Sequence, residues 1–78
     1  MSTATVTTRI SRLHAITIAE ADGIQAYGSL EKFTLEVALQ DDGWHVDYWL
    51  RKPRHAGGGP HYIIDAATGE IVFKKYTQ

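Results

Sequence analysis

Hydrophobic and polar side chains largely alternate in two consecutive stretches of this chain, with Trp49 as an exception. The stretches cover residues 32–40 and 44–51, and Asp41-Asp42-Gly43 separates them. A period of two is typical of a strand with one buried face, and an Asp-Gly pair favours a tight turn. The apolar positions are Phe33, Leu35, Val37, Leu39, Trp44, Val46, Tyr48 and Leu50. This pattern predicts a β-hairpin with its apolar face turned inward.

The residues before this hairpin predict one helix. Ser11 is a suitable N-cap, the helix is expected over residues 12–27, and Gly28 is a natural end. Hydrophobic or small residues recur at spacings of three and four, which places them on one stripe. The stripe consists of Ala15, Ile16, Ala19, Gly23, Ala26, Tyr27 and Leu30. Its smallest members, Ala15, Ala19 and Gly23, are expected to let the helix lie close to a sheet.

The second half of the chain predicts another pair of strands, at residues 61–65 and 70–76. The turn between them is expected at residues 65–69, with the Asp65 carboxylate accepting backbone N–H groups and Gly69 in a left-handed conformation. Residues 52–60 contain two prolines and three consecutive glycines, which predicts a flexible loop that packs into no core.

The order of these elements predicts an α+β fold, α-β-β-β-β, in which one N-terminal helix packs on a four-stranded antiparallel sheet. A chain of 78 residues has room for one core. We therefore expect a single domain over residues 11–78 and a loose N-terminal arm over residues 1–10.

Two sets of features in this sequence resemble known families, and the first set has three members. They are the helix with Ser11, Ala15 and Ala19 at steps of four, the Trp44-x-Val46 strand, and the hairpin of residues 62–71, YIIDAATGEI. Together they resemble the PepSY-like domains. The glycine run before that hairpin, Tyr27-Gly28 and Trp44 are also similar to small bacterial immunity proteins of the cystatin-like, nuclear-transport-factor-like superfold.

The resemblance implies a bacterial, non-catalytic protein. PepSY-like domains are associated with inhibiting or chaperoning proteases, and the immunity proteins with neutralising a toxin. PepSY-like domains usually lie outside the cytoplasm behind a signal peptide or membrane helix. Residues 1–8 lack the basic start and apolar run of a secretory signal, which favours the immunity-type interpretation.

Composition argues against several partner classes and locations. The net charge is −1, so no overall field attracts nucleic acid or an anionic membrane. A small basic cluster of Arg51, Lys52 and Arg54 beside Trp49 could contact nucleic acid, but a solvated loop is the favoured interpretation. No apolar stretch approaches the roughly 20 residues of a membrane span. We expect no nucleic-acid or membrane partner and a cytoplasmic location, or a periplasmic one if a leader has been removed.

The chain offers little for catalysis or metal binding. It has no cysteine, and its histidines, at positions 14, 45, 55 and 61, lack the spacing of a helical zinc site. His45 and His61 could still approach each other across neighbouring strands. Asp47 and Asp65 could form a hydrolytic pair, but the turn explains Asp65 better. We expect no enzyme activity, no cofactor and no metal.

The polar face of the second strand is the most informative feature for function. Trp49 lies there, and tryptophan and arginine are enriched at interface hot spots. The alternative is that the helix, the arm or the loop covers Trp49. The expected partner-binding residues are Asp47, Trp49, Arg51, Arg54 and His55, and the expected partner is a bacterial toxin or protease that the domain inhibits.

Two other functions stay open at this level. A concave sheet could form a small-ligand or enzymatic pocket around Trp44, Tyr48 and Tyr62. Alternatively, an exposed edge strand could pair with another copy to form a homodimer.

Overall fold

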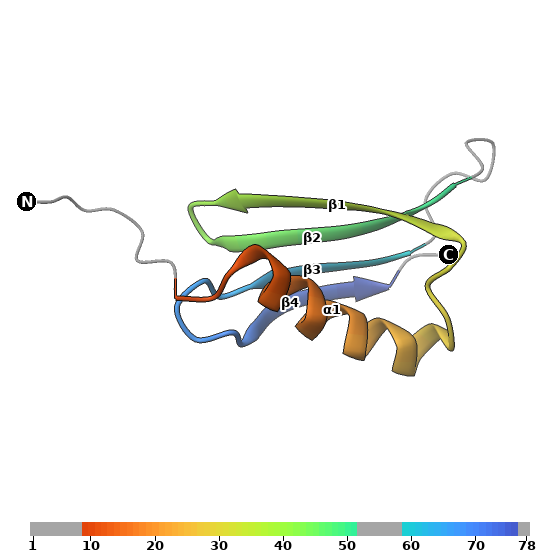
Figure 1. The fold of residues 1–78 in the computed structure, drawn as a ribbon, viewed down its shortest axis with the longest axis horizontal. Coiled ribbons are helices and arrows are strands. Elements are labelled where there is room, and N and C mark those ends of the chain that lie inside the picture. The colour runs from red at the N-terminus through yellow and green to blue at the C-terminus, as the bar shows by residue number, and fades with distance from the viewer. Residues whose placement is uncertain (1–8, 52–58, 77–78) are drawn as a thin grey trace, which may run out of the picture.

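The fold is one helix on one side of a four-stranded antiparallel sheet, as the computed structural model in Figure 1 shows. The structure describes residues 9–51 and 59–76. Its elements are α1 (Arg12–Tyr27), β1 (Phe33–Gln40), β2 (Gly43–Leu50), β3 (Pro60–Ile64) and β4 (Ile71–Tyr76). The strands lie in the order β1-β2-β3-β4, each antiparallel to its neighbours. The predicted α-β-β-β-β class is confirmed.

Both predicted ends of the helix are confirmed. The Ser11 hydroxyl accepts a hydrogen bond of 3.0 Å from the backbone N–H of His14, which satisfies one of the free donors of the first turn. At the other end Gly28 has a positive φ of 84° and its N–H donates to the carbonyl of Ile24. Such a conformation favours glycine, so the helix ends here.

The small-residue face of α1 packs on β2 and β3. Ala15 and Ala19 are fully buried, and Gly23 is buried beside them. A Cβ atom on Gly23 would lie 3.0 Å from Cδ1 of Leu30 and 3.4 Å from the Tyr62 hydroxyl. The predicted close approach is therefore confirmed. Ala26 is exposed instead, because the buried line continues from Gly23 through half-buried Tyr27, four residues on.

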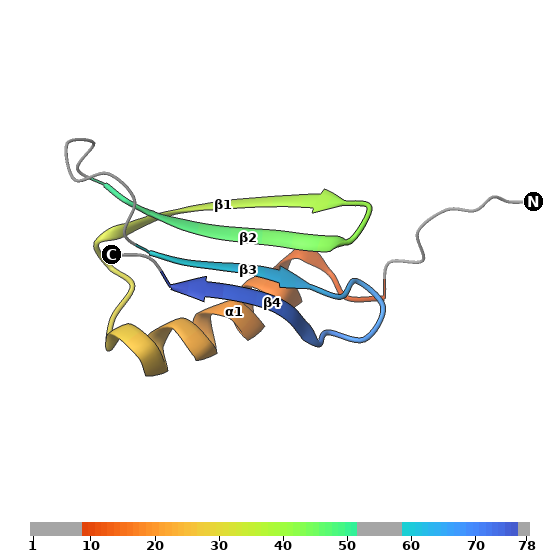
Figure 2. The same cartoon turned by 180° about the vertical axis from the view of Figure 1, so that it is seen from behind.

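One part of the predicted core is wrong. Phe33 is buried and Val37 half-buried, but Leu35 and Leu39 on the same face of β1 are 36% and 42% exposed. Both views of the ribbon show the reason, since β1 is the strand farthest from α1 (Figures 1 and 2). One helix is too narrow to cover a sheet of four strands, whose neighbours are spaced about 4.8 Å apart.

Both predicted turns have the expected backbone. Gly43 has φ of 132° and Gly69 has φ of 83°. The Asp65 carboxylate accepts from the N–H groups of Ala67 and Thr68 at 2.8 and 3.0 Å, and these bonds lower its pKa.

The end of the expected N-terminal arm belongs to the core. Ile10 is buried, and the N–H groups of Arg9 and Ile10 both donate to the carbonyl of Ala66. The indole N–H of Trp44 donates to the carbonyl of Ile10 at 2.7 Å. The folded domain therefore includes at least residues 9 and 10, which the sequence placed in a loose arm.

The end of the expected glycine-rich loop is also packed. Residues 52–58 lie outside the described part of the chain, but Gly59 and Pro60 are buried. A Cβ atom on Gly59 would overlap the carbonyl oxygen of Tyr48 and lie 2.9 Å from its carbonyl carbon. Gly59 thus lets the chain pass close to β2, whereas the sequence assigned it only flexibility.

A carboxylate that the sequence did not single out ties the helix to the sheet. Asp22 of α1 accepts hydrogen bonds from the Tyr62 hydroxyl at 2.9 Å, from the ammonium of Lys74 at 3.2 Å and from the Tyr76 hydroxyl. The bond from Tyr76 is the largest cause that lowers the pKa of Asp22. Burial and the same carboxylate raise the pKa of Tyr62. The cluster joins α1 to both β3 and β4.

Candidate protein-binding surface

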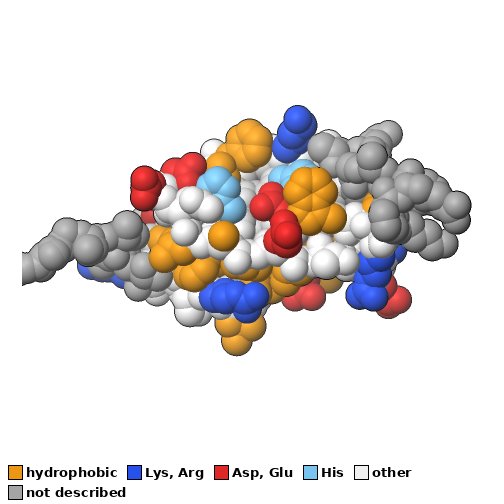
Figure 3. Space-filling view, turned by 90° about the horizontal axis from the view of Figure 1, so that it is seen from above, with side chains coloured by type: hydrophobic (Ala, Val, Ile, Leu, Met, Phe, Trp, Pro, Cys, Tyr) orange, Lys and Arg blue, Asp and Glu red, His pale blue; other side chains and the backbone are white. Residues whose placement is uncertain are grey.

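The face of the sheet opposite the helix carries a mixed polar and aromatic surface. The register aligns one residue from each strand in a row across it, Glu36, Asp47, His61 and Lys75. Figure 3 shows acidic, histidine and large hydrophobic side chains next to one another on this part of the molecule. We call the surface formed by Glu36, Asp47, Trp49 and His61 the Trp49 surface.

Trp49 is exposed, and its ring is held in place. Its side chain, from β2, is 41% exposed, so the prediction that it lies outside the core is confirmed. Its indole N–H donates to a carboxylate oxygen of Glu36 at 3.0 Å. On the other side its ring contacts the His61 ring edge-on, with 4.6 Å between centroids. The two neighbouring strands therefore fix the orientation of the indole.

A second contact fixes the histidine that packs against Trp49. Nδ1 of His61 lies 2.9 Å from a carboxylate oxygen of Asp47, and both side chains are partly buried. A carboxylate at this position orients the imidazole ring. Asp47 thereby supports Trp49 indirectly, although it does not touch the indole in any contact that the structure shows.

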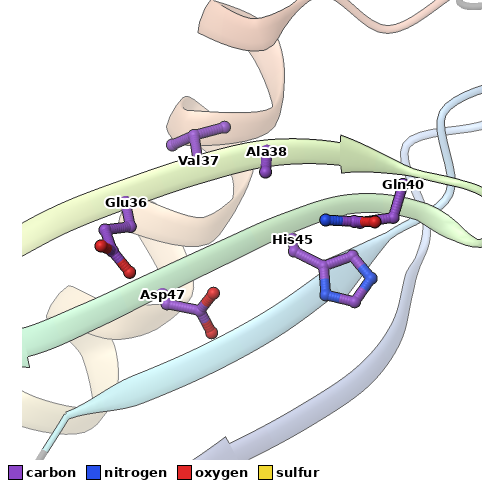
Figure 4. A pocket seen from close by; sticks show the side chains of 6 residues that line it. All are labelled: Glu36, Val37, Ala38, Gln40, His45 and Asp47. Carbon is purple, nitrogen blue, oxygen red and sulfur yellow. The ribbon is translucent and has the colours of Figure 1, made fainter.

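An open depression lies beside Trp49 over β1 and β2. Glu36, Val37, Ala38, Gln40, His45 and Asp47 line it. Figure 4 shows the carboxylates of Glu36 and Asp47 next to each other on its near side, whereas Val37 points toward the helix. At the turn, Nε2 of His45 lies 2.6 Å from a carboxylate oxygen of Asp42, and this bond lowers the pKa of Asp42. Glu36 and Asp47 therefore give one side of the depression an acidic character.

The structure brings together only some of the residues that the sequence selected. Asp47 and Trp49 lie on the same face and belong to one network. Arg51 is exposed at the end of β2, where its Nε donates to the carbonyl of Phe33 at 3.3 Å. Arg54 and His55 lie outside the described residues.

Two members of the network, Glu36 and His61, were missed by the sequence reasoning. Alternation placed Glu36 on the polar face of its strand but could not show that it lies within reach of Trp49. His61 follows the glycine-rich segment after β2, whose length does not fix the register of the next strand. Its partner on β2 was therefore not predictable from spacing. A polar residue at each position was the only available signal.

Neither the metal nor the pocket alternative gains support. Within residues 9–51 and 59–76, no three histidine, aspartate or glutamate side chains are grouped to hold a metal ion. His45 and His61 contact different aspartates. The aromatic side chains proposed to line a ligand pocket, those of Trp44, Tyr48 and Tyr62, are buried in the core cluster under the helix. Of the three, only Tyr48 borders the open groove between α1 and β1 that the structure describes.

No family model, curated protein or solved structure matches this chain. Among the described residues, no helix has both the length and the apolar character that crossing a membrane requires.

Proposed function

We propose that this chain is a small non-catalytic protein-binding domain of the inhibitor or immunity type, and that it docks through the Trp49 surface onto a bacterial toxin or protease. The observation that carries the proposal is the exposed indole of Trp49, held from both sides by Glu36 and His61. The resemblance to PepSY-like domains and small bacterial immunity proteins favours a toxin or a protease as the partner.

A fixed aromatic side chain is well suited to protein recognition. Tryptophan contributes a large contact area with few rotatable bonds, and ordering a side chain before binding reduces the entropy lost on association. The contacts with Glu36 and His61 restrict the Trp49 side chain before any partner binds. Insertion of this indole into a pocket of the partner would therefore stabilise the complex with little further ordering.

The charges around Trp49 define the partner surface further. Glu36 and Asp47 face the same depression, and Asp41 and Asp42 follow at the turn. We therefore expect a pocket for the indole with lysine or arginine side chains at its rim, because complementary charges speed encounter and disfavour wrong partners. The proposal places the domain in the cytoplasm, with the periplasm as the alternative.

Substituting Trp49 with alanine is expected to weaken partner binding by about 30-fold, which corresponds to about 2 kcal/mol. The immobilised wild-type domain is first used to isolate the partner from an extract of the native host, and mass spectrometry identifies it. Titration calorimetry with the purified partner then compares the wild type with Trp49→Ala. If the partner is an enzyme, its activity is measured with and without the domain.

Leu13→Ala is the matched control, because Leu13 is another exposed large hydrophobic residue but lies on the helix. It is expected to bind like the wild type. Circular dichroism establishes that each variant is folded. Equal affinity of folded Trp49→Ala and wild type, or an equal loss in Leu13→Ala, would contradict the assignment of the surface. A partner whose activity is unaffected by the bound domain would contradict the inhibitor role.

A further inference from the structure

The two edges of the sheet differ in how well they are protected against further pairing. The pairing of β4 with β3 shifts by one residue between Ile63 and Ile64, as at a β-bulge. β4 also carries two lysines, at positions 74 and 75. Bulges and lysines are common means of blocking an edge strand. β1 pairs with β2 in an unbroken register over eight residues and contains no lysine or proline. β1 is therefore the unprotected edge.

The backbone groups on that edge can be assigned from the β1–β2 pairing. The N–H of Arg51 donates to the carbonyl of Lys32 at 3.1 Å, and hydrogen-bonded pairs alternate with non-bonded pairs in an antiparallel ladder. Even-numbered residues of β1 therefore bond to β2. The backbone groups of Leu35, Val37 and Leu39 turn away from it, toward the open edge.

The same three residues make the edge apolar on the helix side. Leu35 and Leu39 are more than a third exposed, because α1 lies mainly over β2 and β3. Leu35 also lines a groove between β1 and the helix that includes Ile16 and Ile24. Among the residues that the structure describes, nothing pairs with the outward backbone groups of β1 or covers Leu35 and Leu39.

We propose that a second copy of this chain occupies this edge, with the two β1 strands antiparallel and Val37 opposite Val37 at a two-fold axis. This register places Leu35 opposite Leu39 of the other copy. All three residues with outward backbone groups then lie in hydrogen-bonded pairs. A two-fold axis makes the interface self-complementary, and the exposed leucines cover each other.

The distribution of charge favours a second copy and this register. The end of β1 that carries Lys32 and Arg51 is basic, although Glu31 precedes it, and the opposite end leads into the acidic turn of Asp41 and Asp42. Antiparallel pairing about Val37 therefore brings the basic end of β1 close to the acidic turn of the other copy. Glu36 then faces an alanine, Ala38, of the other copy. A register centred on Glu36 would instead place two carboxylates opposite each other, which is unfavourable.

The dimer would give the molecule two binding surfaces on one side. A two-fold axis perpendicular to the sheet makes one continuous antiparallel sheet of eight strands and keeps both helices on the same face. Both Trp49 side chains then lie on the opposite, uncovered face. This inference is independent of the proposed function, because self-association is measurable without any partner.

Sedimentation equilibrium of the whole chain measures the association. We expect the mass to rise with concentration toward twice 8.7 kDa. Leu39→Lys is expected to weaken the dimer at least tenfold, whereas Phe73→Lys, at an exposed hydrophobic residue of β4, is expected to have no effect. A wild type that stays monomeric at high micromolar concentration contradicts the proposal, as does a dimer that only Phe73→Lys disrupts.

Single cysteines in this cysteine-free chain test the register. Opposed residues of a hydrogen-bonded pair have Cα atoms about 5.5 Å apart, within the range that a disulfide spans. Val37→Cys is therefore expected to cross-link two copies under mild oxidation. Leu39→Cys would be separated from its own copy by about 13 Å along the strands and is expected not to cross-link. Cross-linking of both cysteine variants, or of neither, contradicts the register. If Leu39→Lys and Phe73→Lys both dissociate the dimer, the cross-linking result decides whether β1 forms the interface.

Discussion

Replacing Gly59 with alanine is expected to lower the free energy of unfolding by about 3 kcal/mol, although the change adds a single methyl group. The new Cβ would overlap the carbonyl oxygen of Tyr48 and lie 3.2 Å from the ring of Phe33. A backbone carbonyl in a paired strand cannot rotate away as a side chain can. The start of β3 must therefore move away from β2. Urea denaturation of the purified variant measures the effect.

Gly28→Ala is the matched control for this substitution. Gly28 has a positive φ of 84°, but a Cβ atom there would meet no other atom within 4 Å. The control therefore isolates the conformational cost of losing a glycine, which is about 1 kcal/mol. A loss in Gly59→Ala no larger than in Gly28→Ala would show that the chain does not pass close to Tyr48.

Replacing Asp22 with alanine is expected to cost about 3 kcal/mol of stability. The substitution removes the acceptor of the Tyr62 and Tyr76 hydroxyls, and a hydrogen bond to a charged group contributes about 1.5–3 kcal/mol. Tyr62 is almost fully buried, so its hydroxyl would lose its partner beneath the helix. Thermal and urea unfolding at neutral pH measure this loss.

Asp22 also predicts how stability depends on pH. Its pKa in the folded protein lies below its ordinary value of 3.8. The stabilisation is therefore present above pH 4 and is lost as the pH falls through the lower, folded pKa. Asp22→Asn should consequently lose less stability than the wild type between neutral and strongly acidic pH. Asp41→Asn, at an exposed position in the β1–β2 turn, is the control. The account would be contradicted if Asp22→Asn lost as much stability on acidification as the wild type while Asp41→Asn lost less.

Local signals in the sequence were sufficient to predict the elements and their order. Ser11 and Gly28 delimit the helix because capping depends on neighbouring residues alone. The turns at Gly43 and Gly69 follow from local backbone preferences. Alternation correctly placed Trp49 outside the core, because the side-chain period of a strand is independent of what the strand packs against.

Features that depend on contacts between distant segments were not predictable in the same way. The position of α1 over β2 and β3 leaves Leu35 and Leu39 exposed, and no pattern within β1 distinguishes them from covered leucines. Asp22 meets Tyr62 across 40 residues of sequence. The contact of Trp49 with His61 depends on the register between β2 and β3, two strands that residues 51–59 separate in the sequence. The sequence therefore indicated the Trp49 surface without showing what holds the indole.

Tryptophan fluorescence tests most directly whether the sheet has one covered face and one open face. Trp44 is buried with its indole N–H bonded to Ile10, and Trp49 lies on the opposite face. Each tryptophan is observed alone in the variants Trp44→Phe and Trp49→Phe. With only Trp49 present, the emission should lie at long wavelength and acrylamide should quench it strongly. With only Trp44, it should be blue-shifted and protected. A Trp49 as protected from acrylamide as Trp44 would contradict the account.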